Sequence, residues 1–225
     1  MHPLLLLWDI DGTMLFTKGA GEEALRQTLK NRFGVLDDLG GIEMAGRTDT
    51  SIAKDICDRH PTHNLQPNDL LDAYLEVLPE CLGQKKGGVF PGVRELLQWS
   101  HEHSEVHNAL LTGNIKRGAF IKLGHYGLAN FFEFGAFGDD SPDRNCLGPV
   151  ALKRARDILK RDFHIDYTWV IGDTPKDIAC ARALGCKVLA VATSRYPVAE
   201  LEKHGADFCV ANLSDYKAII QRLES

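Results

Sequence analysis

Short apolar runs alternate along this chain with longer stretches in which apolar residues recur every three or four positions. Six of the runs have the length of buried strands: residues 4–8, 106–111, 132–137, 169–171, 188–191 and 208–210. Six of the longer stretches have helical spacing: residues 91–103, 115–125, 149–161, 175–184, 197–204 and 214–223. Regular alternation of this kind is typical of βα units, whose strands are parallel and buried on both faces. The pattern therefore predicts an α/β protein with a Rossmann-like parallel sheet.

The connection between the first two predicted strands is unusually long. About 97 residues, from Asp9 to Glu105, lie between them, although a crossover needs only about a dozen. The excess has helical patterns over residues 20–33, 48–59 and 68–82, and a Gly-Gly pair at 87–88 returns the chain to the sheet. We therefore predict an α/β core of residues 1–15 and 89–225 and an inserted helical domain of residues 16–88.

Composition and charge narrow the possible classes of protein. A chain of 225 residues is long enough for one sizeable core and a small insert. Its hydrophobic share of 44% and charged share of 25% are ordinary for a globular protein. The net charge of −5, with no long run of Lys and Arg, argues against a nucleic-acid-binding protein.

The same pattern argues against a secreted or membrane protein. The first apolar run has five residues, which is shorter than the apolar region of a signal peptide, and acid follows it at once. No stretch approaches the ~18 apolar residues of a membrane helix. The six cysteines are scattered without a CxxC pair, as expected for reduced thiols. We expect a cytoplasmic protein that contacts no membrane and is a monomer or weak dimer.

Polar residues follow three of the predicted strands where each strand ends: Asp9, Asp11, Thr112, Gly113, Asn114, Asp173 and Asp177. The carboxyl ends of strands in an open parallel sheet are where ligands bind. Carboxylates gathered there repel one another unless a cation joins them. Magnesium is suitable because it takes oxygen ligands and completes its coordination with waters and substrate phosphate. The pattern predicts a Mg²⁺ site that receives a phosphate.

Two aspartates at this position also suggest a reaction. An ionised Asp beside a cation is a plausible nucleophile toward phosphorus, as in aspartyl-phosphate enzymes. A second Asp two residues later can protonate the leaving oxygen and then deprotonate the attacking water. Thr112 and the backbone amides near Gly113 and Asn114 would hold the phosphoryl oxygens. Asp9 and Asp11 would then divide the roles of nucleophile and acid/base between them.

The segments "DIDGT", "LLTGN" and "GDTPKD", in this order, resemble the motifs of the haloacid dehalogenase-like hydrolase superfamily. The helical insert resembles the α-helical cap of its phosphoglycolate phosphatase and β-phosphoglucomutase branch. This resemblance covers nearly the whole chain. It implies that Asp9 is the nucleophile and Asp11 the acid/base. It also implies that Asp9, the Asp11 carbonyl and Asp173 hold Mg²⁺, with Asp177 behind these ligands.

One position departs from the family pattern. The family usually has a lysine before the helix that precedes the third motif, and "SPDRNCLGPVALKRA" has Arg144 where that lysine would align. Arginine neutralises a phosphoryl charge equally well and can do so with two hydrogen bonds. Lys153 is the second candidate, because the interval from Arg144 to Asp173 is a few residues long for the family.

Two further residues have both a functional and a structural interpretation. Thr174 and Asp177 have the spacing of a capping box, so Asp177 is expected to cap a helix as well as support the site. In the insert, Arg47 stands just before a helix whose N-cap is Thr48 or Asp49. A Gly-Arg turn there resembles the cap segment that faces the active site in this branch, although a surface salt bridge is the alternative. We predict that Arg47 contacts the substrate.

Together these observations predict a Mg²⁺-dependent phosphatase for a small phosphorylated metabolite resembling phosphoglycolate or a sugar phosphate. A phosphomutase would use the same core. A phosphonoacetaldehyde hydrolase would need a lysine in the cap for a Schiff base, and Lys54 is the nearest candidate. Asp11 argues against a true haloacid dehalogenase, which needs no acid/base there. A non-catalytic phosphate-binding module would have lost Asp9 or Asp11, and both are present.

Overall fold

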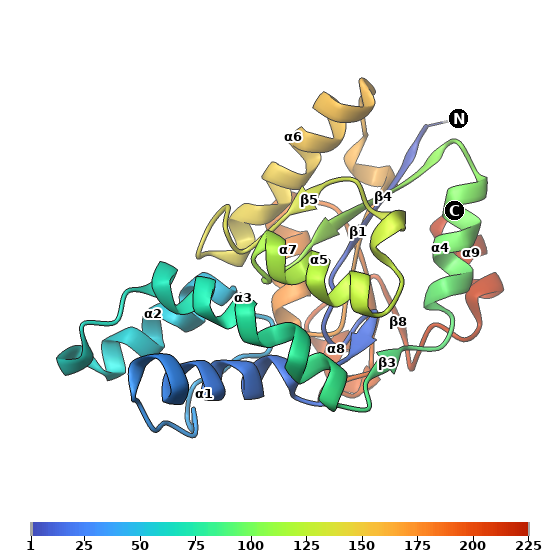
Figure 1. The fold of residues 1–225 in the computed structure, drawn as a ribbon. Coiled ribbons are helices and arrows are strands. Elements are labelled where there is room, and N and C mark those ends of the chain that lie inside the picture. The colour runs from blue at the N-terminus through green and yellow to red at the C-terminus, as the bar shows by residue number, and fades with distance from the viewer. Residues whose placement is uncertain (1, 225) are drawn as a thin grey trace.

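A six-stranded parallel sheet forms the centre of the protein in a computed structural model that describes residues 2–224 (Figure 1). The strand order is β5-β4-β1-β6-β7-β8. The strands are β1 (Leu4–Trp8), β4 (Val106–Leu111), β5 (Gly135–Ala136), β6 (Thr168–Gly172), β7 (Lys187–Val191) and β8 (Phe208–Val210). From β1 the chain builds one side of the sheet with β4 and β5 and the other with β6 to β8. The order therefore reverses beside β1, which is where parallel α/β sheets bind ligands. The predicted α/β fold is confirmed.

The first strand is apolar along its whole length because it is covered on both faces. Leu4, Leu6 and Trp8 belong to one buried apolar cluster, and Leu5 and Leu7 belong to another. Successive side chains of a strand point to opposite faces, so this division follows from the period of two. One cluster contains residues of α4 (Val93–Glu102), α5 (Lys116–His125) and α9 (Tyr216–Leu223). The other contains residues of α6 (Leu147–Leu159), α7 (Pro175–Leu184) and α8 (Val198–Lys203).

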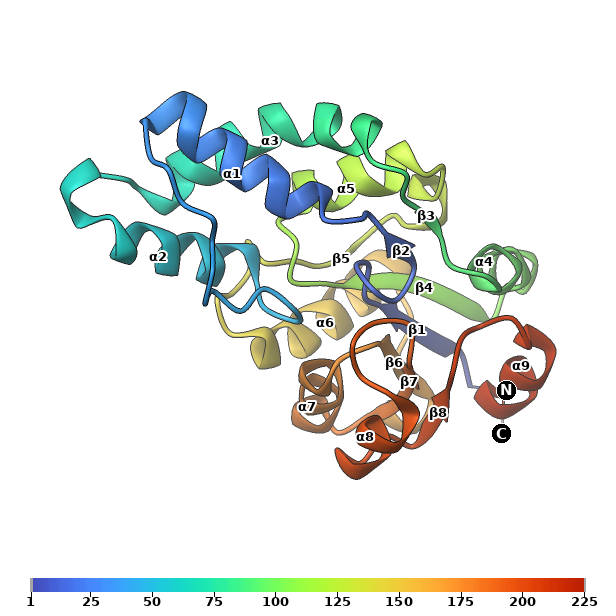
Figure 2. The same cartoon turned by 90° about the horizontal axis from the view of Figure 1, so that it is seen from below.

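The long first connection is helical. It contains α1 (Ala20–Phe33), α2 (Asp49–Arg59), a 3-10 turn (Pro61–His63) and α3 (Pro67–Gln84). These helices share an apolar cluster of their own, which Ile115 of the core joins. They lie together to one side of the sheet (Figures 1 and 2). The insert is joined to the core through a small antiparallel pair, β2 (Leu15–Phe16) with β3 (Gly88–Val89).

The start of α2 is hydrogen-bonded to core loops. The Asp49 amide donates to the Gly113 carbonyl at 2.7 Å, and the Ile115 amide donates to the Asp49 carboxylate at 2.9 Å. The hydroxyls of Thr48 and Thr50 donate to backbone carbonyls of the core, Thr48 to Pro142 at 2.8 Å and Thr50 to Gly138 at 2.9 Å. All four bonds end on backbone atoms of the core.

The strand predicted over residues 132–137 is shorter in the structure. A 3-10 turn (Ala129–Phe131) precedes it, and only Gly135–Ala136 pairs with β4. Phe132 and Phe134 are buried in the clusters on opposite faces of the sheet. These two apolar side chains therefore anchor the edge segment of the sheet and do not indicate a longer strand. A Cβ on Gly135 would lie 2.5 Å from Leu110, so the close approach of β5 to β4 requires glycine.

The predicted helices are present with small shifts at their ends. The helix predicted from residue 149 begins at Leu147, directly after the 3-10 turn Arg144–Cys146 (η3), and another 3-10 turn (Ile165–Tyr167) precedes β6. The helix predicted from residue 214 begins at Tyr216, because the Asp215 side chain caps it. Among the described residues, no helix combines the length and apolar character needed to cross a membrane.

Candidate active site

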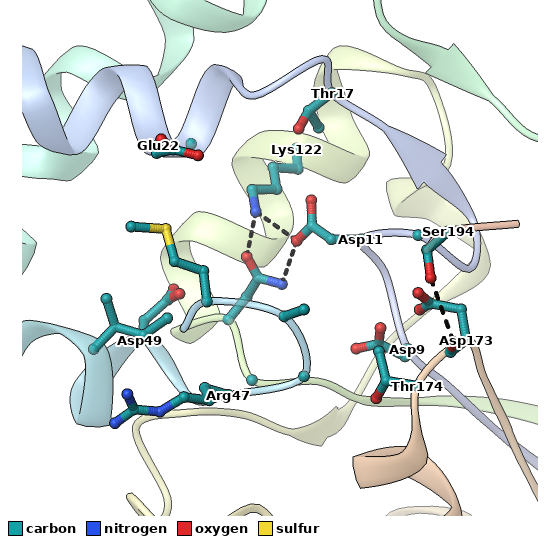
Figure 3. Close-up of a pocket in the computed structure, with 18 of the residues that line it drawn as sticks. Asp9, Asp11, Thr17, Glu22, Arg47, Asp49, Lys122, Asp173, Thr174 and Ser194 are labelled. Atoms are coloured by element: carbon teal, nitrogen blue, oxygen red, sulfur yellow. Dashed lines mark hydrogen bonds and ion pairs between the residues drawn. The ribbon is translucent and has the colours of Figure 1, made fainter. Parts of the chain in front are cut away.

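The ends of β1, β4 and β6 meet at one cavity of about 320 Å³ (Figure 3). The core lines it with residues that include Asp9, Asp11, Gly113, Asn114, Lys122, Arg144 and Asp173. The insert lines it with residues that include Glu22, Leu25, Met44, Asp49, Ile52 and Tyr74. A volume near the lower end of the range for ligand pockets is suitable for a small molecule. The cavity thus places the sequence-predicted acids between the sheet and the helical insert.

Asp9 lies at the floor of this cavity, immediately after β1. It is 5% exposed, and Arg144 Nη2 donates a hydrogen bond of 2.8 Å to its Oδ1. Burial raises the pKa of Asp9 to about 6, with a further contribution from Asp177, while the guanidinium of Arg144 lowers it. A second positive charge beside Asp9 would favour its ionised form.

Arg144 is held in the interior by two acids. Its Nη2 also donates to Asp177, and the residue is 7% exposed. Burial alone would lower the pKa of Arg144, but the carboxylates of Asp177 and Asp9 raise it above its ordinary value. The guanidinium is therefore a fixed positive charge. Its Nε is buried and has no hydrogen-bond partner among the described residues.

Asp173 follows β6 and stands opposite Asp9. Thr13 Oγ1 donates to its Oδ1 at 2.9 Å. Burial raises the pKa of Asp173 well above its ordinary value, and the charges of Asp177 and Asp9 raise it further. Gly12 has a φ of 87°, and a Cβ there would lie 2.3 Å from Asp173 Oδ2. The "DGT" turn needs glycine at this position because its backbone passes directly over Asp173.

Asp177 completes the acidic group and has the predicted capping role. It forms a capping box with Thr174 at the start of α7. One carboxylate oxygen accepts from the Thr174 amide at 2.9 Å, the Thr174 hydroxyl at 2.7 Å and the Asp173 amide at 3.2 Å. The other oxygen faces Arg144. Both oxygens are engaged, so Asp177 has the geometry of a residue that supports the site from behind.

These residues fit a magnesium ion. Carboxylate oxygens of Asp9, Asp173 and Asp177 lie within 4.8 Å of one another. One guanidinium contacts only two of these three buried acids, Asp9 and Asp177, and the raised pKa values of Asp9 and Asp173 follow from burial and from the repulsion of neighbouring carboxylates. Two carboxylates with a carbonyl are the kind of donor set that Mg²⁺ uses. Asp9 and Asp173 could serve as ligands, because the hydrogen bonds from Arg144 and Thr13 engage only Oδ1 of each. Both oxygens of Asp177 already have partners.

Asp11 belongs to a second group of contacts on the other side of the cavity (Figure 3). Its Oδ2 accepts hydrogen bonds from Lys122 Nζ at 2.6 Å and Asn114 Nδ2 at 2.8 Å. Lys122 Nζ also lies 2.6 Å from Asn114 Oδ1. Asn114 Nδ2 is 2.9 Å from the hydroxyl of Thr112, which is fully buried behind the cavity wall. Thr112 thus supports Asn114, while Gly113 and Asn114 face the cavity.

Lys122 is a site residue that the sequence analysis did not single out. Burial alone would lower its pKa, but Asp11, Tyr74 and Asp49 raise the pKa of Lys122 above its ordinary value. The signal in the sequence is its position on α5. Ala119, Lys122 and Leu123 have the i, i+3, i+4 spacing of one helical face, and all three are buried. A lysine among the apolar positions of a helix is a candidate for a buried ion pair.

Comparison with known proteins assigns the family. A sequence model of haloacid dehalogenase-like hydrolases matches residues 6–182. The chain belongs to the haloacid dehalogenase-like hydrolase family. It is 26% identical over 209 residues to a phosphoglycolate phosphatase of Pseudomonas fluorescens, a match that covers 84% of this chain and 69% of the relative.

Solved structures share the fold. CbbY from Rhodobacter sphaeroides, in complex with phosphate, has a TM-score of 0.76 at 17% identity, with 95% of this chain and 96% of that chain covered. A hydrolase from Pseudomonas syringae has a TM-score of 0.72 at 21% identity, with 97% and 98% covered. The predicted resemblance to the phosphoglycolate phosphatase and β-phosphoglucomutase branch is confirmed by the family match and the Pseudomonas relative, and the family of this haloacid dehalogenase-like protein is one of hydrolases.

The three basic residues considered for this haloacid dehalogenase-like site differ in their position relative to the cavity. Arg144 contacts Asp9, whereas Lys153 is 78% exposed and pairs with Asp157 on the surface of α6. The geometry therefore favours Arg144 for the position of the family lysine. Lys54, the candidate for a Schiff base, is 67% exposed on α2 and pairs with Asp58.

Arg47 contributes its backbone to the cavity and turns its charge away. A Cβ on Gly113 would lie 2.0 Å from the Arg47 carbonyl oxygen, so the two loops are in direct contact. The guanidinium points away from Asp9 (Figure 3) and pairs with Asp55 of α2 at 2.5 Å. Lys122, and not Arg47, is the cation that faces Asp11. A substrate contact by the Arg47 side chain stays a prediction that this conformation does not favour.

Proposed function

We propose that this protein is a Mg²⁺-dependent phosphatase that hydrolyses a small phosphate monoester through an aspartyl-phosphate on Asp9. The observation that carries the proposal is the position of Asp9. Its carboxylate lies at the floor of a cavity, between the guanidinium of Arg144 and the carboxylate of Asp173. Asp11 stands at the side of the same cavity.

The proposed reaction has two steps. In the first, the Asp9 carboxylate attacks phosphorus, the bond to the leaving oxygen breaks, and Asp11 gives that oxygen a proton. In the second, Asp11 takes a proton from a water that attacks phosphorus, the bond between phosphorus and Asp9 breaks, and the Asp9 carboxylate is regenerated as phosphate leaves. Arg144 and the backbone near Gly113 and Asn114 would hold the phosphoryl oxygens. The buried floor would exclude other water from Asp9.

Magnesium would be held by Asp9, Asp173 and the carbonyl of Asp11. When bound, Mg²⁺ would offset the negative charge shared by the acids and the phosphoryl group. The raised pKa of Asp9, about 6, supports this assignment. A nucleophilic carboxylate must be ionised, and a buried one needs positive charge nearby to stay so at neutral pH.

The helical insert, residues 16–88, is proposed as a cap that selects the substrate. Two observations support this. Helices α1, α2 and α3 all contribute residues to the cavity, among them Glu22, Ile52 and Tyr74. The two chain connections between the insert and the core pass through the short β2–β3 pair, where a small rotation would open or close the cavity.

The alternatives on the same core are less well supported by the geometry. A Schiff base needs an uncharged lysine in the cavity. Lys54 is exposed, and Lys122 is ion-paired with a raised pKa. A phosphomutase would use the same residues and differ in whether water or a second hydroxyl receives the phosphoryl group.

The proposal is tested with a panel of phosphate esters that includes phosphoglycolate, sugar phosphates, nucleotides and pyrophosphate. Phosphate release should require Mg²⁺ and cease with chelator. Asp9→Asn should reduce turnover below detection while its circular dichroism spectrum and melting behaviour remain those of a folded protein. Exchange of a phosphoryl group between two sugar phosphates without phosphate release would instead favour the mutase. Appreciable turnover by a clean Asp9→Asn preparation would exclude the aspartyl-phosphate.

A further inference from the structure

Lys122 has contacts that the reaction proposed above does not yet use. We propose that Lys122 is a positioning residue, which fixes the carboxyl group of Asp11 for proton transfer to the leaving group. This inference rests on the proposed acid/base role of Asp11.

The first argument is the geometry of three side chains. Lys122 Nζ contacts Asp11 Oδ2 and Asn114 Oδ1, both at 2.6 Å, and Asn114 Nδ2 contacts the same Asp11 oxygen at 2.8 Å. The Asp11 side chain is 40% exposed, while that of Lys122 is 6% exposed. The reactive carboxyl faces the cavity, and the cation that holds it is supported from behind by the core.

The second argument concerns the two oxygens of Asp11. Oδ2 accepts two hydrogen bonds, one of them from an ammonium group. An oxygen engaged in this way is a poor place for a proton, because a carboxylic O–H would face two donors. The proton that Asp11 transfers would therefore be carried by Oδ1. Lys122 and Asn114 thus select the oxygen that serves the leaving group and limit rotation of the carboxyl.

The third argument is energetic. A buried ion pair contributes little to stability compared with well-packed apolar residues of similar volume. Lys122 lies on the buried face of α5, and Ile115 at the start of that helix belongs to the apolar cluster of the insert. A cation here is thus poorly explained by folding. It is explained by the carboxyl group it holds.

The surroundings of Lys122 keep its Nζ in place. Tyr74 of α3 and Asp49 of α2 contribute to its raised pKa, so charged or polar groups face it from the insert as well as from the core. On α1, Gly21 leaves the necessary space. A Cβ at that position would lie 3.5 Å from the Tyr74 hydroxyl and 3.9 Å from Lys122 Nζ. Each helix of the insert therefore borders the ammonium group.

The test compares substrates that differ in their need for an acid. An alkyl phosphate needs protonation of its leaving oxygen, whereas 2,4-dinitrophenyl phosphate does not. With Lys122→Met, kcat/KM for the best alkyl phosphate of the panel should fall by about 10²-fold, which is the lower range of general acid catalysis. kcat/KM for the dinitrophenyl ester should stay within about threefold, since a positioning residue for the acid has no other part in that reaction.

Three further variants make the result decisive. Asp11→Asn should show the same dependence on the leaving group, and the double variant Asp11→Asn/Lys122→Met should be no slower than Asp11→Asn alone. Lys122→Arg, which keeps a charged donor, should recover part of the lost rate. Lys116→Met, which removes an exposed lysine from the same helix, is the control and should match the wild type.

The outcomes separate this inference from the proposed function. Equal losses for both substrates with Lys122→Met would mean that Lys122 serves the fold, and the inference would be overturned. No loss for either substrate would overturn it as well. If Lys122→Met does not fold, the comparison of Lys122→Arg with Lys122→Gln decides in the same way. If Asp11→Asn itself lacks the leaving-group dependence, the acid/base role of Asp11 fails, and that failure is distinct from failure of Lys122.

Discussion

Arg144 and Asp9 are 135 positions apart in the chain and joined by a hydrogen bond of 2.8 Å. The same guanidinium contacts Asp177, so one arginine neutralises two buried acids from different strand ends. The short 3-10 turn η3 places it there, and the Asp143 side chain caps that turn by accepting from the Asn145 amide. Both contacts are made by Nη2, whose two N–H bonds diverge in the plane of the guanidinium. One nitrogen of the arginine thus reaches both carboxylates at once.

Replacing Arg144 should therefore damage both stability and activity. Arg144→Met leaves Asp9 and Asp177 buried without their partner, and such losses cost about 3–5 kcal/mol. Arg144→Lys should cost less and retain measurable turnover. Urea unfolding and steady-state kinetics check these results. Lys153→Met is the matched control, because Lys153 is exposed on α6. A wild-type rate in Arg144→Met together with a large loss in Lys153→Met would reverse the assignment.

Removing Asp173 should separate metal binding from folding. Asp173→Asn retains an acceptor for Thr13 and removes one of the repelling charges, so the variant should melt at a higher temperature than the wild type in chelator. Mg²⁺ at about one hundred times its Kd should stabilise the wild type by about 2.7 kcal/mol. The variant should show little of this gain. Calorimetry with and without Mg²⁺ measures both effects, and a full Mg²⁺ gain in the variant would argue against Asp173 as a ligand.

The pH dependence of the free energy of unfolding should show the effect of burying the carboxyl group of Asp49. Burial raises the pKa of Asp49 from its ordinary 3.8 to about 6, although the charge of Lys122 and the Ile115 amide lower it in part. At a pH between these two pKa values, Asp49 keeps its proton in the folded protein and has lost it in the unfolded chain. The free energy of unfolding should therefore fall as the pH rises from about 4 to about 6, by roughly 2–3 kcal/mol at most from this group.

Asp49→Asn should make this fall smaller and raise the stability at pH 7, since the amide oxygen can still accept from Ile115. Denaturant titrations at several pH values in chelator give the comparison. Asp69→Asn, at an exposed acid in the first turn of α3, should leave the pH profile as it is in the wild type. An unchanged profile in Asp49→Asn would show that Asp49 is ionised in the folded protein at no cost.

Arg47→Ala should have a small effect on catalysis. The guanidinium pairs with Asp55 and the Ser51 carbonyl, on the side of α2 away from Asp9. An exposed pair of this kind contributes about 0.2–1 kcal/mol, so a slight loss of stability is expected and KM should change less than about twofold. A KM raised several-fold for the best substrate, with p-nitrophenyl phosphate unaffected, would support the contact predicted from the sequence.

The strands and most helices were predictable because apolar spacing is a local property. The five apolar residues before Asp9 already imply a strand covered on both faces. The convergence of Asp9, Asn114 and Asp173 followed from a general rule about strand ends. The direction of the Arg47 side chain did not follow from such a rule, because its guanidinium pairs with Asp55 instead of facing the cavity. Lys122 was missed for a related reason: lysine usually lies on the surface, and only its partner Asp11, 111 positions away, explains its burial.

The bonds between the start of α2 and the core have a consequence for the range of molecules that such a protein can accept. Each of them ends on a backbone atom of the core, and the β2–β3 pair at the other side is also made by backbone. Gly113 even excludes a side chain where it meets the Arg47 carbonyl. Leu25, Met44 and Ile52 line the cavity without making any of these hydrogen bonds, although they pack in or against the apolar cluster of the insert. Exchanges among apolar side chains of suitable size would therefore change the lining while the two parts of the molecule continue to meet in the same way.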